Sequence, residues 1–160
     1  MRRTARTVAP VYIRPQITAP SFVDDAGVPI PYGDRWNFDD GPPPESYSRE
    51  SNLGRFAPLH TIANALIDHL VRTYDVTVTD LGPGSDYRNA TVRHVAIGPV
   101  VGDRVVVLLT DYPSAGARFG PDHEVHYPRC SCDACDETWE YGAEMLEFEI
   151  LRVAAHWPRR

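Results

Sequence analysis

The sequence predicts an α+β fold, a two-layer domain in which two helices cover one face of a mostly antiparallel sheet of three to five strands. Three observations lead to this prediction. Apolar residues recur at helical spacing near residues 58–74 and again from Trp139 to Trp157. Several short strand patterns lie between these two segments, and the connections between them have the length of hairpins. A Pro-rich, extended N-terminal arm precedes the domain.

The arm covers residues 1–43 and is followed by a single α+β domain over residues 44–160. Eight of the 15 prolines fall in residues 1–44, and proline fixes φ and lacks an N–H donor, which disfavours helices and central strands. Large apolar side chains nevertheless punctuate the arm at Tyr12, Ile13, Phe22, Tyr32, Trp36 and Phe38. The arm is therefore either a disordered leader or a segment whose aromatic side chains dock on the domain or on a partner.

The first helix is expected at residues 58–74. Pro58 suits a first helical turn, and apolar residues follow it at spacings of three and four. These residues are Leu59, Ile62, Leu66, Leu70 and Tyr74. Most polar residues of the segment lie off this stripe, so the helix has one face for the core.

Five segments between the helices have the composition of strands. Residues 75–79 alternate valine with threonine, which is typical of a half-buried strand, and residues 81–86 are expected to form a loop rich in glycine. Residues 91–97 predict a second strand. Residues 104–110 are apolar on both faces and predict the central strand. Short further strands are expected at 117–119 and 123–127.

The last helix has two apolar faces. Its main stripe runs from Trp139 to Trp157 at spacings of four and three. Tyr141, Met145 and Phe148 fall nearly opposite this stripe. Because a single layer cannot bury both faces, either the arm or a loop covers the second face, or that face binds a protein partner or a second copy of the chain.

Composition narrows the classes of function. The chain has 16 basic and 22 acidic residues and a formal net charge of −6, which argues against non-specific binding of nucleic acid. All basic residues are arginine, so chemistry that needs a lysine amine is excluded. No stretch approaches the roughly 18 consecutive apolar residues of a membrane span. The first 20 residues also lack the apolar run of a signal peptide. We therefore expect a cytoplasmic protein with no membrane or nucleic-acid partner.

The most informative motif is a cluster of three cysteines, Cys130, Cys132 and Cys135. Their odd number and close spacing argue against a disulfide framework. Thiolates suit zinc, which takes four ligands in a tetrahedron. Residues two apart in an extended chain point the same way, so Cys130 and Cys132 can share one ion. Cys135, expected at the start of the last helix, can turn back toward them, and zinc is the predicted cofactor.

The spacing leaves the fourth zinc ligand open. His126 lies on the same face as Cys130 by alternation, but four extended residues span about 13 Å, so the chain has to fold back between them. A longer stretch of chain separates His123 from Cys130, so it can fold back more easily. Further candidates are Asp133, Asp136, His60 and His94. Either aspartate can instead cap the last helix.

Two other interpretations of the cysteines compete with zinc. The three thiols can be free of metal, as small buried side chains. Alternatively, one of them is a reactive thiol, because a helix N-terminus lowers a thiol pKa. The acidic residues Asp133, Asp136 and Glu137 oppose a second negative charge there and argue against this last interpretation.

Four strings of residues form a recognisable set along the chain. They are Tyr32-Gly33-Asp34-Arg35-Trp36, Arg55-Phe56-Ala57-Pro58-Leu59-His60-Thr61, Thr110-Asp111-Tyr112-Pro113 and Cys130-Ser131-Cys132-Asp133-Ala134-Cys135-Asp136-Glu137. The set resembles a family of small actinobacterial proteins that form a domain of unknown function, and the resemblance runs from about Tyr32 to about Leu151. In that family a histidine stands seven residues before the first cysteine, so the resemblance implies His123. No established activity of the family carries over.

These features predict a small protein without catalysis, a binding or interaction module in which the cysteine cluster holds a structural zinc ion. The alternative is a small enzyme with a pocket near Asp111, at the end of the central strand, that uses the cysteines or a nearby histidine. The two hypotheses differ at the metal. A catalytic zinc keeps an open coordination position beside a concave pocket, whereas a structural zinc is closed by four protein ligands.

Overall fold

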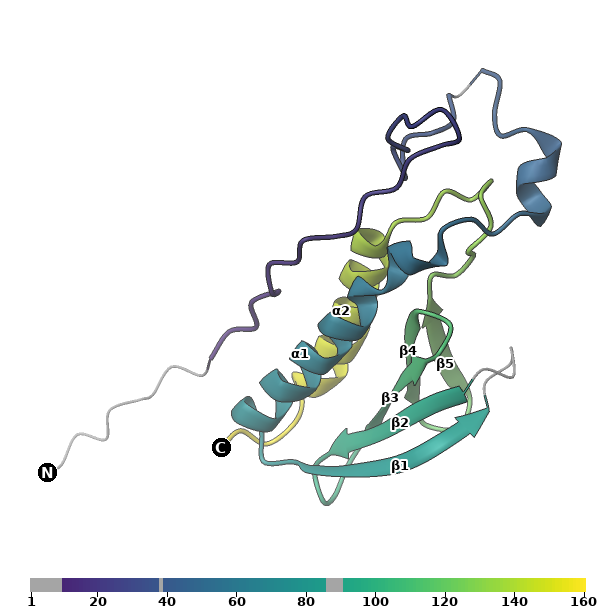
Figure 1. Ribbon diagram of the computed structural model, residues 1–160. Helices are drawn as coiled ribbons and strands as arrows, with labels where there is room; N and C mark the ends of the chain where they lie inside the picture. The colour runs from purple at the N-terminus through teal and green to yellow at the C-terminus, as the bar shows by residue number, and fades with distance from the viewer. Residues whose placement is uncertain (1–9, 38, 86–90) are drawn as a thin grey trace, which may run out of the picture.

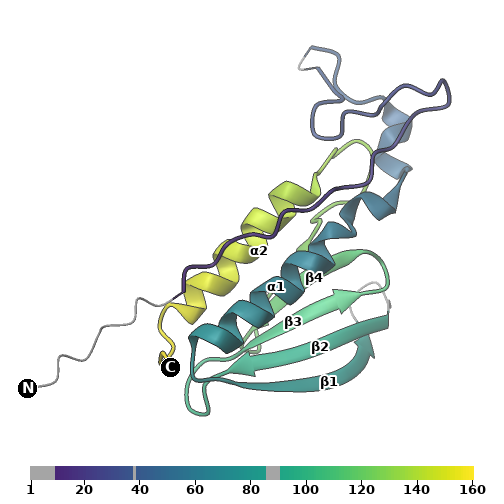
Figure 2. The same cartoon turned by 60° about the vertical axis from the view of Figure 1, so that its left-hand side comes forward.

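The computed structural model describes residues 10–37, 39–85 and 91–160. In chain order the elements are η1 (Pro44–Ser48), η2 (Leu53–Phe56), α1 (Pro58–Thr73), β1 (Thr77–Ser85), β2 (Thr91–Gly98), β3 (Val105–Thr110), β4 (Ser114–Phe119), β5 (His123–Tyr127) and α2 (Trp139–Ala154), where η denotes a 3-10 helix. Helices α1 and α2 lie side by side on one face of a twisted sheet (Figure 1 and Figure 2). The predicted two-layer α+β fold is confirmed.

The sheet is an antiparallel meander in which each strand pairs with the next, in the order β1-β2-β3-β4-β5. This topology follows from the short connections, because antiparallel neighbours can be joined by hairpins. Strand β3 is central, as its two-sided apolar pattern predicts. Val105, Val107 and Leu109 belong to the core under the helices, and Leu108, which alternation places on the other face, is buried as well.

Strand β1 is longer than the sequence predicts. A loop was expected at residues 81–86, but β1 continues to Ser85, and residue 86 lies outside the described residues. A register shift between Asp80 and Gly82 accommodates the extra residue as a β-bulge, and Gly82 takes the positive φ of 75° that the bulge requires. Pro83 is tolerated because β1 is the edge strand, where one side of the backbone has no neighbour to pair with.

The core lies between the sheet and the apolar stripes of the two helices. The stripes supply Leu59, Ile62, Leu66 and Leu70 from α1 and Ala143, Leu146 and Ile150 from α2, all fully buried. Each such leucine or isoleucine contributes roughly 1.5–3 kcal/mol relative to exposure. Trp157 continues the stripe beyond the end of α2, and its ring meets Tyr74 edge-on at 5.9 Å.

In the ranges that the structure describes, no helix is long and apolar enough to cross a bilayer.

The arm docks along the helices over its described residues. Figure 2 shows it running lengthwise along α1 and α2, on the side of the helices away from the sheet. The Tyr12 hydroxyl donates to Glu147 at 2.9 Å, and Arg14 donates to the same carboxylate at 2.6 Å. Ile17 packs against the core. The arm is therefore docked on the domain over its described residues. Phe38, one of the aromatic residues of the arm, lies outside the described residues.

A buried histidine lies beneath the docked arm. The His69 ring meets Tyr12 edge-on at 5.4 Å and Tyr74 edge-on at 6.5 Å. Burial lowers the pKa of His69, and the nearby positive charge of Arg72 lowers it further. Both effects favour the uncharged imidazole, which is compatible with the aromatic contacts on both sides of it.

The second apolar face of α2 is left largely uncovered. Met145 packs against the core, but Tyr141 is 46% exposed and Phe148 is 59% exposed. The arm reaches α2 at Glu147, between these two aromatic residues in sequence, without burying either of them.

Replacing Glu147 by alanine should release the arm, because one carboxylate accepts the hydrogen bonds of both Tyr12 and Arg14. Hydrogen bonds to a charged group contribute about 1.5–3 kcal/mol, so we expect a stability loss in that range by urea unfolding. Cleavage by chymotrypsin at Tyr12 should also be faster than in the wild type. Glu144→Ala, at an exposed position one turn earlier on the same helix, is the control. It removes only a Coulombic attraction to Arg14 and no hydrogen bond to the arm, so it should change both measurements much less. Equal effects of the two substitutions would contradict the docked arm.

Candidate metal centre

The three cysteine sulfurs converge at the loop between β5 and α2. One ligand atom from each of Cys130, Cys132 and Cys135 lies within 4.8 Å of the others, and the Cys130 thiol donates to the Cys132 sulfur at 3.2 Å. Zinc–sulfur bonds of about 2.3 Å place tetrahedral thiolates about 3.8 Å apart. The sulfurs thus have the spacing of ligands to one ion without a change in the course of the backbone.

The thiols affect one another strongly. Burial raises the pKa of Cys132, but hydrogen bonds from the Cys130 thiol and from backbone N–H groups of Cys135 and Ala134 outweigh burial, so that the pKa is lowered. Hydrogen bonds with Cys130, burial, and the nearby Cys132 raise the pKa of Cys135 to about 12. Without a cation the cluster therefore favours ionisation of Cys132 over ionisation of Cys135. A divalent ion would allow all three to ionise.

A buried aspartate fixes the course of the cysteine loop. Asp133 is 5% exposed, and its carboxylate accepts from the Ser51 amide at 2.9 Å and the Ser51 hydroxyl at 2.7 Å. The guanidinium groups of Arg35 and Arg55 lie 3.9 Å from the same carboxylate. The Asp133 carbonyl accepts from Arg35 at 2.5 Å and from the Trp36 indole at 3.0 Å. One residue thus joins the arm, the segment before α1 and the cysteine loop.

The carboxylates of the two acidic residues after Cys135 also accept hydrogen bonds from other parts of the protein. Asp136, at a positive φ of 51°, accepts from the backbone N–H groups of Gly33 and Arg35 and from the Arg35 guanidinium at 2.5 Å. Glu137 accepts from the backbone N–H groups of Arg129 and Cys130. Helix α2 is capped by Thr138, whose side chain accepts from Tyr141 N, so neither Asp133 nor Asp136 is the helix cap that the sequence suggested.

The structure does not bring His123 or His126 to the sulfurs. The His126 ring is hydrogen-bonded to Glu124 at 2.6 Å, and the His123 ring lies on Phe119 with a centroid distance of 5.4 Å. The reason is that β5 stays paired with β4 as far as Tyr127, which keeps both histidines on an extended strand. The chain does not fold back within the strand, as a histidine ligand would require.

The other candidates for a fourth ligand also lie outside the cluster. Among the described residues, the ligating group consists of the three cysteines. The His60 ring is hydrogen-bonded to the Ser114 carbonyl at 2.9 Å, and His94 lies on β2 beside Gly84. The described part of the chain therefore supplies three ligands to the candidate centre.

A cavity of about 340 Å³ opens beside the exposed cysteine. It is lined by Gly33, Cys135, Asp136, Glu137, Thr138 and Tyr141. Cys132 is buried and Cys130 half-buried, so Cys135 is the most accessible of the three. The metal cluster thus adjoins a concave surface on its Cys135 side.

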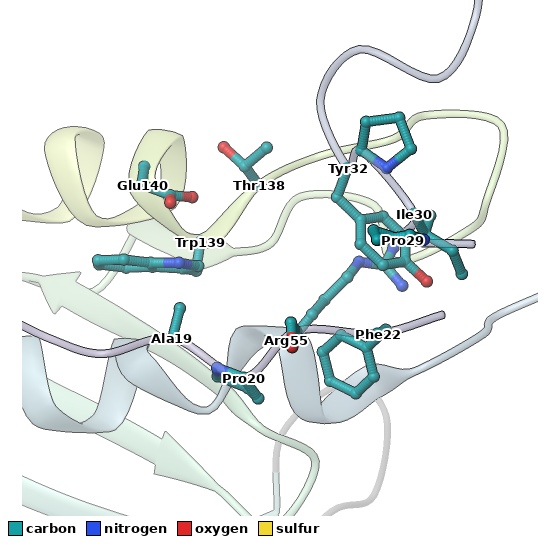
Figure 3. A pocket seen from close by; sticks show the side chains of 12 residues that line it. Ala19, Pro20, Phe22, Pro29, Ile30, Tyr32, Arg55, Thr138, Trp139 and Glu140 are labelled. Atoms are coloured by element: carbon teal, nitrogen blue, oxygen red, sulfur yellow. The ribbon is translucent and has the colours of Figure 1, made fainter. Parts of the chain in front are cut away.

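A second cavity, of about 280 Å³, lies between the arm and the start of α2 (Figure 3). Phe22 and Tyr32 come from the arm and Trp139 from α2, and Arg55 extends between them toward the Tyr32 ring. Its guanidinium lies 4.4 Å from the ring centroids of Tyr32 and Phe56 and donates to the carbonyls of Ser51 and Ser131. These contacts give Arg55 a structural role. The walls of the cavity are mainly apolar.

The pocket that the enzyme hypothesis requires near Asp111 has a counterpart in a third cavity. It is lined by Asp111 together with His60, Asp80, Arg93 and neighbouring residues. The three cysteines, all of which the structure describes, are not among the residues that line it. This cavity and the thiol cluster are therefore separate features.

Sequence reasoning missed the residues that hold the site in place. The sequence patterns do not single out Arg35, Trp36 or Arg55, and they predict Asp133 and Asp136 as ligands or helix caps rather than as partners of arginine. A signal was present nevertheless. The strings around Arg35, Arg55 and Cys132 carry the family resemblance, and the structure brings these three strings together around Asp133.

The model of a family described as "Family of unknown function (DUF6226)" matches residues 18–156. The match begins in the arm, earlier than the resemblance from about Tyr32. Neither a curated protein nor a solved structure matches the chain.

Replacing Asp133 by asparagine should destabilise the cysteine loop while keeping the shape of the side chain. The substitution leaves Arg35 and Arg55 without their shared carboxylate, and removing one partner of a buried ion pair costs about 3–5 kcal/mol. Urea unfolding would measure the loss. Asp34→Asn, at an exposed position beside Arg35, is the matched control and should change stability by less than about 0.5 kcal/mol. A small effect at position 133 would show that the buried charge is dispensable.

Proposed function

The chain belongs to the DUF6226 family of unknown function, and we propose that it is a zinc-binding, non-catalytic module in which Cys130, Cys132 and Cys135 hold one ion. The observation that carries this proposal is the approach of the three sulfurs to within 4.8 Å of one another. Soft thiolate ligands favour zinc over magnesium or calcium, which prefer oxygen.

The ion would stabilise the loop between β5 and α2. A structural zinc contributes about 10–16 kcal/mol of apparent binding free energy, which is comparable to the net stability of a whole domain. The loop is also held by the ionic contacts of Asp133 and Asp136. We therefore expect metal removal to lower the stability of this end of the molecule while the sheet and helices persist.

Three protein ligands beside a cavity are what the enzyme hypothesis predicts for a catalytic zinc. The carboxylates beside the metal nevertheless favour binding over catalysis. A catalytic zinc needs a group that can accept or deliver a proton near the bound water or substrate. Asp136 and Glu137, which line the cavity next to Cys135, already accept hydrogen bonds from backbone N–H groups. Both carboxylates are therefore already used to hold the protein's own backbone.

The proposal includes a protein partner at the outer face of α2 and a location in the cytoplasm. Tyr141 and Phe148 are both exposed and lie seven residues apart, on the same side of the helix. A second copy of the chain is the simplest partner, because one helix face can pair with itself about a twofold axis. The cytoplasm keeps thiols reduced, which a zinc site of cysteines requires.

Protein purified without a histidine tag or chelator should contain about one zinc per chain by elemental analysis. Cys130→Ser, Cys132→Ser and Cys135→Ser should each lose most of the metal, because each removes one of three ligands. His123→Ala and His126→Ala are the controls and should retain it, since both imidazoles lie outside the cluster. Metal-free protein whose three thiols react freely without denaturant would rule out the zinc site.

Phe148→Glu should prevent self-association through α2 by placing a charge on the apolar face. Light scattering after size exclusion would show a dimer for the wild type and a monomer for the variant. Val101→Glu is the control, because Val101 is equally apolar and 88% exposed but lies in the β2–β3 connection. A wild-type monomer at all concentrations would exclude the second copy as the partner.

A further inference from the structure

We propose that the zinc ion keeps one coordination position open toward the cavity at Cys135, and that this position takes a neutral nitrogen donor of the imidazole class from outside the chain. The inference rests on the proposed zinc site. It goes further by assigning the site an exchangeable ligand and by stating the chemistry of that ligand.

The number of donors leads to the open position. Zinc takes four ligands, and the ligating group among the described residues consists of three cysteines. Of the residues outside the described ranges, Asp86 alone belongs to a ligating type. The nearest carboxylates, Asp136 and Glu137, would have to give up hydrogen bonds from backbone N–H groups to reach the ion.

The burial of the sulfurs places the open position on one side of the cluster. Cys132 is buried against the protein and Cys130 is half-buried, whereas Cys135 is exposed and lines the cavity. A small molecule can therefore approach the ion from the Cys135 side. The cavity volume of about 340 Å³ is sufficient for a five-membered ring.

The charge at the site selects a neutral donor. Three thiolates and a zinc ion together carry about one negative charge, and the carboxylates of Asp136 and Glu137 line the same cavity. Arg35 is paired with Asp136, so it does not offer its charge to an incoming anion. A further anion would meet net repulsion, whereas an imidazole nitrogen adds no charge and is a common zinc ligand.

Tyr141 provides an aromatic wall beside the open position. It lines the cavity together with Cys135. An aromatic ligand such as imidazole gains about 0.5–1.5 kcal/mol from a well-placed ring contact, which corresponds to about two- to tenfold in affinity. The cavity thus favours a ligand with a flat aromatic ring over a nitrogen donor that has no ring.

The test is to load the full chain with cobalt(II) in place of zinc and titrate it with imidazole. Thiolate-to-cobalt charge-transfer absorption reports whether the cysteines hold the metal, and the cobalt ligand-field bands report the fourth ligand. We expect the charge-transfer absorption to remain while the ligand-field bands shift in a saturable way. Thiocyanate at the same ionic strength should bind more weakly than imidazole.

Variants locate the imidazole at the cavity. Tyr141→Ala should weaken the cobalt-bound imidazole by about two- to tenfold, with the charge-transfer absorption unchanged. Tyr47→Ala is the matched control, because Tyr47 is an exposed tyrosine in η1 that does not line the cavity. Its affinity for imidazole should equal that of the wild type.

The outcomes separate this inference from the proposed function. Charge-transfer absorption with ligand-field bands that do not respond to imidazole would overturn the open position but leave the zinc site intact. Tighter binding of thiocyanate than of imidazole would overturn the choice of a neutral donor. The absence of charge-transfer absorption would overturn both the zinc site and its open position.

Discussion

Two buried carboxylates and two arginines form the ionic frame on which the cysteine loop depends. Asp133 and Asp136 would each be costly to bury as unpaired ions, so the loop can take its course only where Arg35 and Arg55 reach it. Those arginines come from the arm and from η2, far from the loop in the sequence. The need to compensate charge therefore brings three distant segments together at one end of the two-layer domain.

The ionic frame also determines which atoms are left for a metal. The carboxylates nearest the cysteines accept hydrogen bonds from arginine and from backbone N–H groups, so they act in the structure rather than as ligands. The sulfur atoms are the ligands that remain for a metal. Their mutual proximity lowers the pKa of Cys132 and raises the pKa of Cys135. The structural and chemical roles in this loop are divided between oxygen and sulfur.

The sequence predicted most of the fold because the fold is built on local periodicity. The stripes of α1 and α2 and the two-sided apolar run of β3 are visible within short windows. The convergence of Cys130 and Cys132 was also predictable, since residues two apart share a face. The extension of β1 was not, because a glycine and a proline mark a loop unless the edge position of the strand is known.

The long-range contacts escaped prediction for a different reason. Nothing in the spacing of Arg35 or Glu147 indicates a partner about a hundred residues away. Periodicity describes how one element presents a face, whereas an ion pair between a loop and an arm depends on the assembled chain. The strings that carry the family resemblance mark these distant segments. They do not show which segment pairs with which.

The separation between the arm and its contacts has a consequence for biosynthesis. Arg35 leaves the ribosome 98 residues before Asp133, and Tyr12 leaves it 135 residues before Glu147. At translation rates of 5–20 residues per second, the arm is made roughly 5–27 s before the residues that it binds. The hairpins of the meander can pair as they emerge, whereas the thiol loop reaches its final course only after the arm, η2 and the loop itself have all been made.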